Sequence, residues 1–344
     1  MHRHNHGPST PNGRLLETTH RQNHHLTMWH TLLTFGGGFW QERGGFTRTG
    51  MQAALLPDRG AVKVSGDDAR KFLNGLLTCD MAKVTPASAR FAALLTPQGK
   101  IIVDFIVAEA PAEDGGGFFL DCPRALAGLL TEKLKFYKLR AKVMCENLSE
   151  VLGVMAVWDG AAGTEYGLCY ADPRLPALGA RVMLPPHLAS EAAADMGATL
   201  AEAQAYEAHR IALGVPRGGV DFIYGDAFPH EADMDQLAGV DFDKGCYVGQ
   251  EVVSRVQHRA SARSRVVPVT YDGAAPIGGV PVLAGEKEIG MFGSAAHGHG
   301  LALMRLDRAA EAQTAGTAIT AGGVTIRLVK PDWAQFDWPQ APAS

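Results

Sequence analysis

The sequence predicts an α+β protein with two successive lobes and a C-terminal unit made of β-strands. Strand and helix patterns alternate from residue 51 to about residue 145, and the alternation restarts at Val151. After residue 264 only short valine-rich segments with glycine turns follow, which is typical of a small barrel or sandwich. We expect a body at 51–264, with lobes at about 51–145 and 146–264, a β-unit at 265–330 and a tail at 331–344.

Residues 1–50 form an extension rich in histidine and glycine without helix or strand periodicity, so we expect it to be disordered. It holds seven of the thirteen histidines, but a tail without fixed ligand geometry predicts no metal site. It lacks the apolar segment of a secretory signal, and serine is scarce for a transit peptide. We expect a cytoplasmic protein with Met51 as a candidate start, or a mitochondrial-matrix protein if the extension is a transit peptide.

The first lobe begins with a predicted strand, helix and hairpin. Residues 61–64 alternate like a strand, and Gly66 and Asp67 then favour a turn and the start of a helix. This helix would carry four apolar residues on one side: Phe72, Leu73, Leu76 and Leu77. Residues 91–95 and 101–107 are predicted strands. The turn between them, Thr96-Pro97-Gln98-Gly99-Lys100, makes a β-hairpin.

Asp104 stands in the second strand of this hairpin, with apolar residues on both sides. A carboxylate buried there without a partner would cost several kcal/mol, since roughly 2–7 kcal/mol applies even to neutral polar groups. Two interpretations stay open. Asp104 either lies on the solvated face of a half-buried strand, or it is a functional carboxylate with a partner.

The rest of the first lobe is predicted to hold a strand at 118–122 and a helix that begins at Pro123 and runs through Leu134. Solvated lysines are one interpretation of the basic residues that follow, because cations are favoured near a helix C-terminus. The other interpretation is a surface that faces an anion, either a polyglutamate tail or a protein partner. The basic residues are Lys133, Lys135, Lys138, Arg140 and Lys142.

The second lobe is predicted to contain strands at 151–158, 166–170 and 180–184. Thr199 and Glu202 have the spacing of a capping box, for a helix that runs through Arg210 and stops at Gly214. A structural or surface ion pair is the default role for Arg210. The carboxylates between Gly214 and residue 243 lack the spacing of a calcium loop.

The greatest concentration of reactive groups is the segment Lys244-Gly245-Cys246-Tyr247-Val248-Gly249-Gln250-Glu251. Its glycines permit close approach of the backbone to a ligand. The neighbouring Lys244 can lower the pKa of the Cys246 thiol, and a thiolate is a nucleophile or a soft-metal ligand. Alternatively, Cys246 packs in the core as a small hydrophobic residue. Whether Arg255, Arg259 and Arg263 lie on a helix or a strand stays open.

Composition excludes several classes of protein. The formal charge of −4 over 344 residues argues against nucleic acid or membrane as the main partner. The apolar run at 151–158 is too short to span a bilayer. The five cysteines are odd in number and contain no C-x-x-C, which indicates a reducing compartment. They also predict that this chain alone holds no iron-sulfur cluster, because clusters typically need four closely spaced thiolates.

The 244–251 segment resembles the K-G-C-Y-x-G-Q-E signature of the YgfZ family. Members of this family are folate-binding iron-sulfur assembly factors, similar in fold to the glycine-cleavage T-protein, an aminomethyltransferase. The resemblance extends from about Leu55 to about Val329. It implies two α/β lobes around a central folate cleft and a C-terminal β-barrel. It also implies assembly or repair of iron-sulfur clusters in other proteins, which would be its partners, and we expect a monomer.

The resemblance also implies roles for individual residues in folate binding. Asp104 matches the second Asp of the T-protein segment N-x-x-G-G-x-x-D-D and is expected to hold the pterin of tetrahydrofolate. Glu231, in Phe-Pro-His-Glu, is a second carboxylate for the pterin. Arg210 matches an arginine of the T-protein and would meet a folate carboxylate.

For the motif itself, the resemblance implies that Cys246 is the key thiol beside the folate. Lys244 would favour its thiolate through charge. Tyr247 would stack on the folate or donate a hydrogen bond to it, and Gln250 and Glu251 would anchor the loop.

Two rival functions are kept, and whether the chain is an enzyme stays open. A T-protein-like aminomethyltransferase would use Asp104 and need no cysteine, but Val103 stands where the T-protein segment has its first Asp and Lys100 where it has its second Gly. An interaction protein would use the folate cleft only as a scaffold. The leading hypothesis requires Cys246 and Asp104 to share one cleft.

Overall fold

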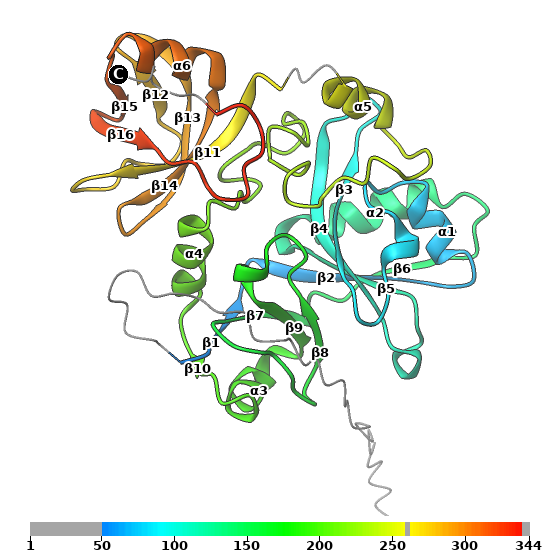
Figure 1. The fold of residues 1–344 in the computed structure, drawn as a ribbon. Helices are drawn as coiled ribbons and strands as arrows, with labels where there is room; N and C mark the ends of the chain where they lie inside the picture. Colours follow the sequence, from blue (N-terminus) through cyan, green and yellow to red (C-terminus); the bar gives the residue numbers. More distant parts are fainter. Residues whose placement is uncertain (1–49, 259–261, 339–344) are drawn as a thin grey trace, which may run out of the picture.

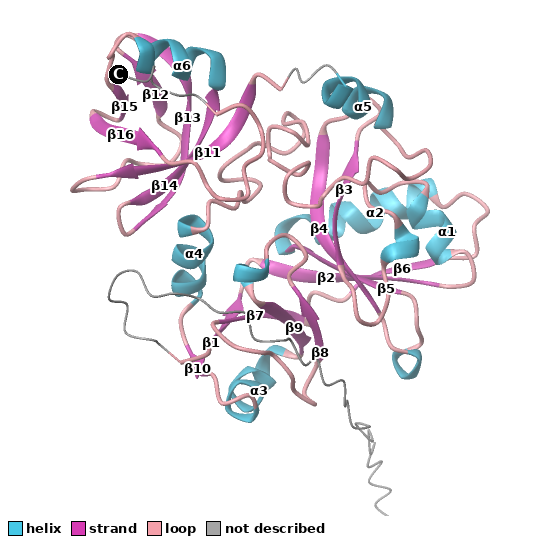
Figure 2. Ribbon diagram, in the orientation of Figure 1, coloured by secondary structure: helices cyan, strands magenta, loops and turns pink. Residues whose placement is uncertain are grey.

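The computed structural model describes residues 50–258 and 262–338. Two five-stranded sheets and a closed barrel organise these residues (Figure 1). Figure 2 shows them as three separate groups of strands. The predicted α+β class and the C-terminal barrel are therefore confirmed. The disorder predicted for residues 1–50 concerns, apart from Gly50, residues outside the described part.

The first sheet contains, in spatial order, β3 (Arg90–Leu95), β4 (Ile101–Glu109), β5 (Phe118–Pro123), β2 (Arg59–Ser65) and β6 (Met144–Asn147). The pair β3–β4 is the predicted hairpin, with Ala93 opposite Asp104. Helices α1 (Ala69–Asn74) and α2 (Ala127–Tyr137) bury Leu73 and Leu130 against this sheet. The prediction that this second helix begins at Pro123 is wrong, because the residues directly after Pro123 form a short 3-10 turn.

The second sheet contains, in spatial order, β10 (Thr199–Leu200), β1 (Gln52–Leu56), β7 (Gly153–Trp158), β9 (Ala180–Leu184) and β8 (Leu168–Ala171). Because β1 comes from the start of the described chain, the two lobes are not successive in sequence. A division at residue 145 separates β1 from its sheet and cuts through β6. Helix α3 (Ala189–Asp195) covers one face of the sheet, and α4 (Ala203–Ala212) follows β10.

The helix predicted to stop at Gly214 is present as α4, but its predicted capping box is wrong. Thr199 pairs with Gln52 in the sheet instead of capping a helix. Glu202 is the N-cap residue of α4 but forms no capping hydrogen bond through its side chain. Gly214 follows the helix with a φ of 76°, in the left-handed region that favours glycine.

Residues 213–249 connect α4 to α5 (Gln250–His258) mainly through turns. The helix α5 settles the open question for Arg255, which lies on a helix, whereas Arg259 falls outside the described residues. The barrel follows, and its connection α6 (Leu306–Thr314) is a helix that the sequence reading missed. The barrel strands, in spatial order, are β11 (Ser264–Tyr271), β14 (His299–Arg305), β13 (Lys287–Ala296), β12 (Pro281–Ala284), β15 (Ile319–Ala321) and β16 (Val324–Leu328).

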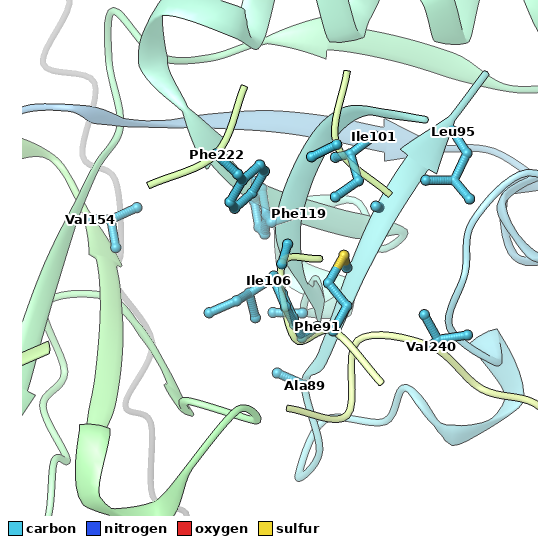
Figure 3. Packing of buried hydrophobic residues seen from close by; sticks show 14 of the residues in the cluster. Ala89, Phe91, Leu95, Ile101, Ile106, Phe119, Val154, Phe222 and Val240 are labelled. Atoms are coloured by element: carbon cyan, nitrogen blue, oxygen red, sulfur yellow. The ribbon is translucent and has the colours of Figure 1, made fainter. Parts of the chain in front are cut away.

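The two lobes share one apolar core. Ile106 on β4, Phe119 on β5, Val154 on β7 and Phe222 from the connection after α4 belong to the same buried cluster (Figure 3). Burial of apolar surface contributes about 25 cal/mol per Å², so this shared cluster holds the lobes together as one body. The described part of the tail is also attached, since the indole of Trp333 donates a hydrogen bond of 2.9 Å to the carbonyl of Leu213.

Candidate functional site

A cavity of about 290 Å³ lies where the two lobes meet α4. Both sheets contribute charged residues to its wall, and so does the connection after α4. The lining holds five arginines and three carboxylates, but Asp121, Asp172 and Asp221 lie buried behind the wall and pair with these arginines, so the charges around the cavity nearly balance. The arginines of the lining are Arg59, Arg174, Arg181, Arg210 and Arg217, and its carboxylates are Asp58, Asp104 and Glu207.

Asp104 is buried in this cavity wall on the face of β4 that carries Ile106. The interpretation of a solvated Asp104 is therefore wrong. The hydroxyl of Tyr224 donates a hydrogen bond to Oδ1 of Asp104. Burial, together with the charge of Asp104, raises the pKa of Tyr224, so the phenol keeps its proton. Within the described residues this is the only hydrogen bond to the Asp104 side chain, and the second carboxylate oxygen is left for a ligand.

A network of buried charges supports the cavity from the second lobe. Arg181 donates hydrogen bonds of 3.3 Å to Asp172 and 3.0 Å to the hydroxyl of Tyr206. Burial alone would raise the pKa of Asp172, but the charge and hydrogen bonds of Arg174, with the charge of Arg181, lower it to about 2. The Nη1 atom of Arg181 is buried without a hydrogen-bond partner among the described residues. Its charge is nevertheless compensated within the protein, because Oδ2 of Asp121 lies 3.8 Å from it.

On the first lobe, Arg59 pairs with a buried carboxylate as Arg181 does on the second lobe. Its Nε donates a hydrogen bond of 2.7 Å to Oδ1 of Asp121, a carboxylate with no exposed surface. Tyr170 donates a hydrogen bond of 3.1 Å to the other oxygen of Asp121. Sequence reading missed Arg59, Arg181 and Tyr224. One signal was present: Asp121 is a charge inside the apolar strand 118–122, as Asp104 is inside its own strand.

Arg210 lines the same cavity, but its guanidinium is fully used inside the protein. Nε and Nη2 donate to Glu207, at 3.0 and 2.5 Å. Nη1 donates to the carbonyl of Val215 and, at 2.9 Å, to Asp221. Nη2 also donates to the hydroxyl of Ser294 at 2.9 Å, which ties α4 to the barrel. No N–H group is left for a folate carboxylate in this arrangement, so the default role as a structural ion pair holds.

None of residues 244–251 lines the cavity that contains Asp104. Cys246 lies on an exposed loop before α5, so its packing in the core is also excluded. The ammonium of Lys244 is buried and donates to the carbonyls of Asn74, Leu77 and Cys79 at 2.7, 2.6 and 2.7 Å. Lys244 therefore fastens the loop to the end of α1 and forms no hydrogen bond with the thiol. The required common cleft for Cys246 and Asp104 is not found.

The other motif residues also have structural contacts. Tyr247 is buried, and burial together with the charge of Asp241 raises its pKa to about 12. Gly249 has a φ of 82°, and a Cβ there would lie 2.6 Å from the carbonyl oxygen of Thr96. The motif thus packs against the turn of the β3–β4 hairpin. Gln250 and Glu251 begin α5, where exposed Glu251 pairs with Arg255 at 2.7 Å.

Glu231 is half-buried and lies outside the cavity lining. Its Oε2 accepts a hydrogen bond of 2.8 Å from the backbone N–H of Phe228, and burial raises its pKa. The structure therefore brings Asp104 and Arg210 to one cavity and places Glu231 and the motif residues elsewhere. Among the described residues, no group of three or more His, Cys, Asp or Glu side chains is arranged to hold a metal ion. No described helix is long and apolar enough to cross a membrane.

Three comparisons with known proteins relate this chain to others. Residues 263–336 match the family described as CAF17, C-terminal beta-barrel domain. The iron-sulfur cluster assembly factor IBA57, mitochondrial, of Mus musculus is 32% identical over 324 residues, which cover 83% of this chain and 85% of that protein. Its Homo sapiens counterpart is 30% identical over 83% of this chain and 84% of that protein. The Mycosarcoma maydis homolog is 33% identical over 69% of this chain.

The chain spans about 60% of the length of the fungal relatives that it matches. A solved structure of the glycine cleavage system aminomethyltransferase T from Bartonella henselae covers 85% of this chain with a TM-score of 0.67. At 16% identity this likeness shows the fold alone. It confirms the predicted T-protein-like architecture.

The names of the relatives correct one prediction, because IBA57 proteins of mouse, human and fungi are all described as mitochondrial. The expected cytoplasmic location is contradicted. The predicted family resemblance is confirmed, since the mouse relative is matched over most of its length. This chain belongs to the IBA57/CAF17 family, of YgfZ type.

Proposed function

We propose that this chain is an accessory factor in the assembly or repair of iron-sulfur clusters in other proteins, with Cys246 as its working thiol. The relatives named as iron-sulfur cluster assembly factors support this function. The structural observation that carries it is the exposure of Cys246. Of the other four cysteines, three are buried and Cys169 is half-buried. Burial raises the pKa of Cys79 and of Cys122 to about 12 and keeps both as thiols.

A soft ligand or nucleophile for another protein must be both reachable and able to lose its proton. Cys246 meets the first condition because its loop is exposed, and a Cβ at the neighbouring Gly245 would meet nothing within 4 Å, so the backbone there is open to a partner. One thiolate cannot hold a cluster alone, since clusters typically need four ligands. The remaining ligands would therefore come from the partner protein.

We further propose that the cavity between the lobes binds tetrahydrofolate or a derivative. The free oxygen of Asp104 can accept a hydrogen bond from the donor edge of a pterin. Arg59 and Arg217 line the same cavity and keep N–H groups that form no hydrogen bond within the described residues, so they can hold the glutamate carboxylates. When bound, the folate would supply a carrier for one-carbon units. Because the cavity and Cys246 are separate, folate binding would support the fold or its regulation, and the thiol would act at the surface.

The thiol is tested by Cys246→Ser, with Cys169→Ser as a matched control. Both variants are introduced into cells that lack the native protein, and the activity of an aconitase-type enzyme is measured. We expect loss of this activity with Cys246→Ser only, with unchanged thermal stability because Cys246 is exposed. Normal aconitase-type activity with Cys246→Ser would show that the assignment is wrong. Folate-dependent aminomethyl transfer by that variant would then favour the aminomethyltransferase.

The cavity is tested by calorimetric titration of purified protein with tetrahydrofolate. Asp104→Asn removes a charged acceptor, for which about 1.5–3 kcal/mol is typical, so we expect roughly 10- to 150-fold weaker binding. Leu200→Ser, at an exposed position outside the cavity, is the control and should bind normally. Equal affinity of Asp104→Asn and the wild type would exclude Asp104 from the site. No affinity in the wild type would mean that the cavity is only a scaffold.

A further inference from the structure

The surface around the end of α2 and the edge strand β6 exposes apolar side chains that the proposed function does not use. Among the described residues, eleven large hydrophobic residues have exposed side chains, and four of them fall within residues 129–144. Phe136 is 75% exposed and Leu139 is 87% exposed. Single exposed hydrophobic residues are ordinary, but a group of them marks an interaction site. We call this group the α2–β6 patch: Leu129, Phe136, Leu139 and Met144.

The backbone holds the patch in a fixed shape. Leu139 has a φ of 44°, in the left-handed region where a bulky residue is rare and strained. Burial of the Leu139 side chain does not offset this backbone strain, since the side chain is exposed to solvent. The loop around it is nevertheless bonded: Lys138 donates its Nζ to the carbonyl of Val143 at 3.1 Å, and the N–H of Ala141 donates to the carbonyl of Lys138 at 2.7 Å. Strain that the surroundings maintain is typical of functional sites.

The patch adjoins an open sheet edge. Strand β6 is the last strand of the first sheet, and in the part of the chain that the structure describes it pairs with β2 alone. Met144, the first residue of β6, is 55% exposed. An edge strand with exposed apolar side chains is a template for binding another chain.

The charge around the patch identifies the kind of partner. Lys133, Lys135, Lys138, Arg140 and Lys142 lie within ten residues, against the exposed carboxylates of Glu132 and Glu146. None of these five cations forms an ion pair within residues 50–258 and 262–338. An acidic protein surface with an apolar centre complements this arrangement. The negative net charge of the whole chain, −4, disfavours an anionic membrane.

The segment between α2 and β6, which carries Leu139 of the patch, and the loop of Cys246 contact the two ends of the same short helix. At the start of α1, Asp68 accepts a hydrogen bond of 2.7 Å from the backbone N–H of Lys142. At the end of α1, Lys244 donates to the carbonyl of Asn74. The six residues of α1 span about 9 Å at 1.5 Å per residue. One protein interface, typically about 800 Å² per partner, is wide enough to extend from one end of α1 to the other.

We propose that the α2–β6 patch is the docking surface for an acidic protein partner that exchanges a cluster or its components at Cys246. The proposal rests on the function proposed above. Phe136 and Leu139 are the apolar anchors, and the surrounding lysines and Arg140 steer the acidic partner onto the surface. The partner is then already bound and oriented when it reaches the thiol of Cys246.

The test uses the double variant Phe136→Ser/Leu139→Ser in the same cells, with Ile277→Ser on the barrel as the matched control. Ile277 is 77% exposed, so both substitutions remove apolar surface without opening the core. We expect the double variant to lower aconitase-type activity at least fivefold, with unchanged reactivity of Cys246 toward Ellman's reagent. The double charge reversal Lys135→Glu/Lys142→Glu should have the same effect. The Ile277→Ser control should be normal.

Binding is followed separately, with photoreactive benzoylphenylalanine in place of Phe136 or, as control, in place of Ile277. We expect a crosslink from the first position to an acidic protein that itself carries a cluster, and its loss in Lys135→Glu/Lys142→Glu. If Cys246→Ser keeps normal activity while the crosslink persists, the proposed function fails and the docking surface stands. Wild-type activity of Phe136→Ser/Leu139→Ser where Cys246→Ser is inactive would overturn the docking surface. So would flotation of the wild type with phosphatidylglycerol vesicles that the double variant loses.

Discussion

Replacing Lys244 by methionine would remove a cation from the centre of three backbone carbonyls at 2.6 to 2.7 Å while keeping a side chain of similar length. Each hydrogen bond to a charged group contributes about 1.5–3 kcal/mol. Their sum overstates the effect, because the buried ammonium has given up its hydration. Methionine leaves the three buried carbonyl oxygens without this donor, an unsatisfied acceptor costs about 1–3 kcal/mol, and we therefore expect Lys244→Met to lower the free energy of unfolding by about 3–5 kcal/mol in all.

Urea unfolding of Lys244→Met and the wild type measures this difference directly. The rate at which Cys246 reacts with Ellman's reagent separates the two roles considered for Lys244. If Lys244 fastens the loop, its removal lowers stability and the thiol reacts at least as fast as before. If Lys244 acts by favouring the thiolate, the reaction slows and its pH midpoint rises. Glu251→Gln, at an exposed ion pair, is the control and should change stability by less than about 0.5 kcal/mol. Wild-type stability of Lys244→Met would refute the fastening role.

Three further substitutions test other parts of the structure. Arg210→Ala leaves the buried carboxylate of Asp221 without its guanidinium, so thermal unfolding should show a loss of about 3–5 kcal/mol; a loss below 1 kcal/mol contradicts this role. Asp172 has a pKa of about 2, lowered from 3.8, so its ionisation stabilises the fold by roughly 2 kcal/mol above pH 4, and this contribution disappears as the pH falls through 2. The stability difference between the wild type and Asp172→Asn should shrink accordingly over that range, and a constant difference contradicts the shift. Gly249→Ala puts a methyl group against the Thr96 carbonyl and should destabilise the protein by about 1–3 kcal/mol in urea unfolding, whereas an unchanged midpoint would contradict this packing.

Features that depend on residues close together in the chain were predictable from the sequence. The β3–β4 hairpin follows from two alternating segments and a turn with Pro97 and Gly99, and the barrel strands follow from valine-rich segments between glycines. The capping box failed for a long-range reason: Thr199 has the right spacing for a cap, but pairing with Gln52 in the sheet competes for the same residue. Gln52 lies far from Thr199 in the sequence, so no local pattern predicts their pairing.

The site was predictable only in part, for a similar reason. Asp104 stands out because apolar neighbours force it to find a partner, but that partner, Tyr224, is 120 positions away. The position of Cys246 on an accessible loop agrees with the glycines around it. The role of Lys244 could not be foreseen, because it binds main-chain carbonyls, which every residue possesses and which leave no trace in the sequence.

The place of β1 in the second sheet has a consequence for biosynthesis. Gln52 of β1 pairs with Trp158 of β7 but is synthesised well before it, so β1 emerges from the ribosome about 100 residues ahead of β7. At the usual 5–20 residues per second, this apolar segment waits roughly 5 to 20 seconds without a neighbour. During that interval the nascent chain presents a strand suited to aggregation or to a chaperone, and the second sheet can be completed only after β10, which ends at Leu200, has been translated.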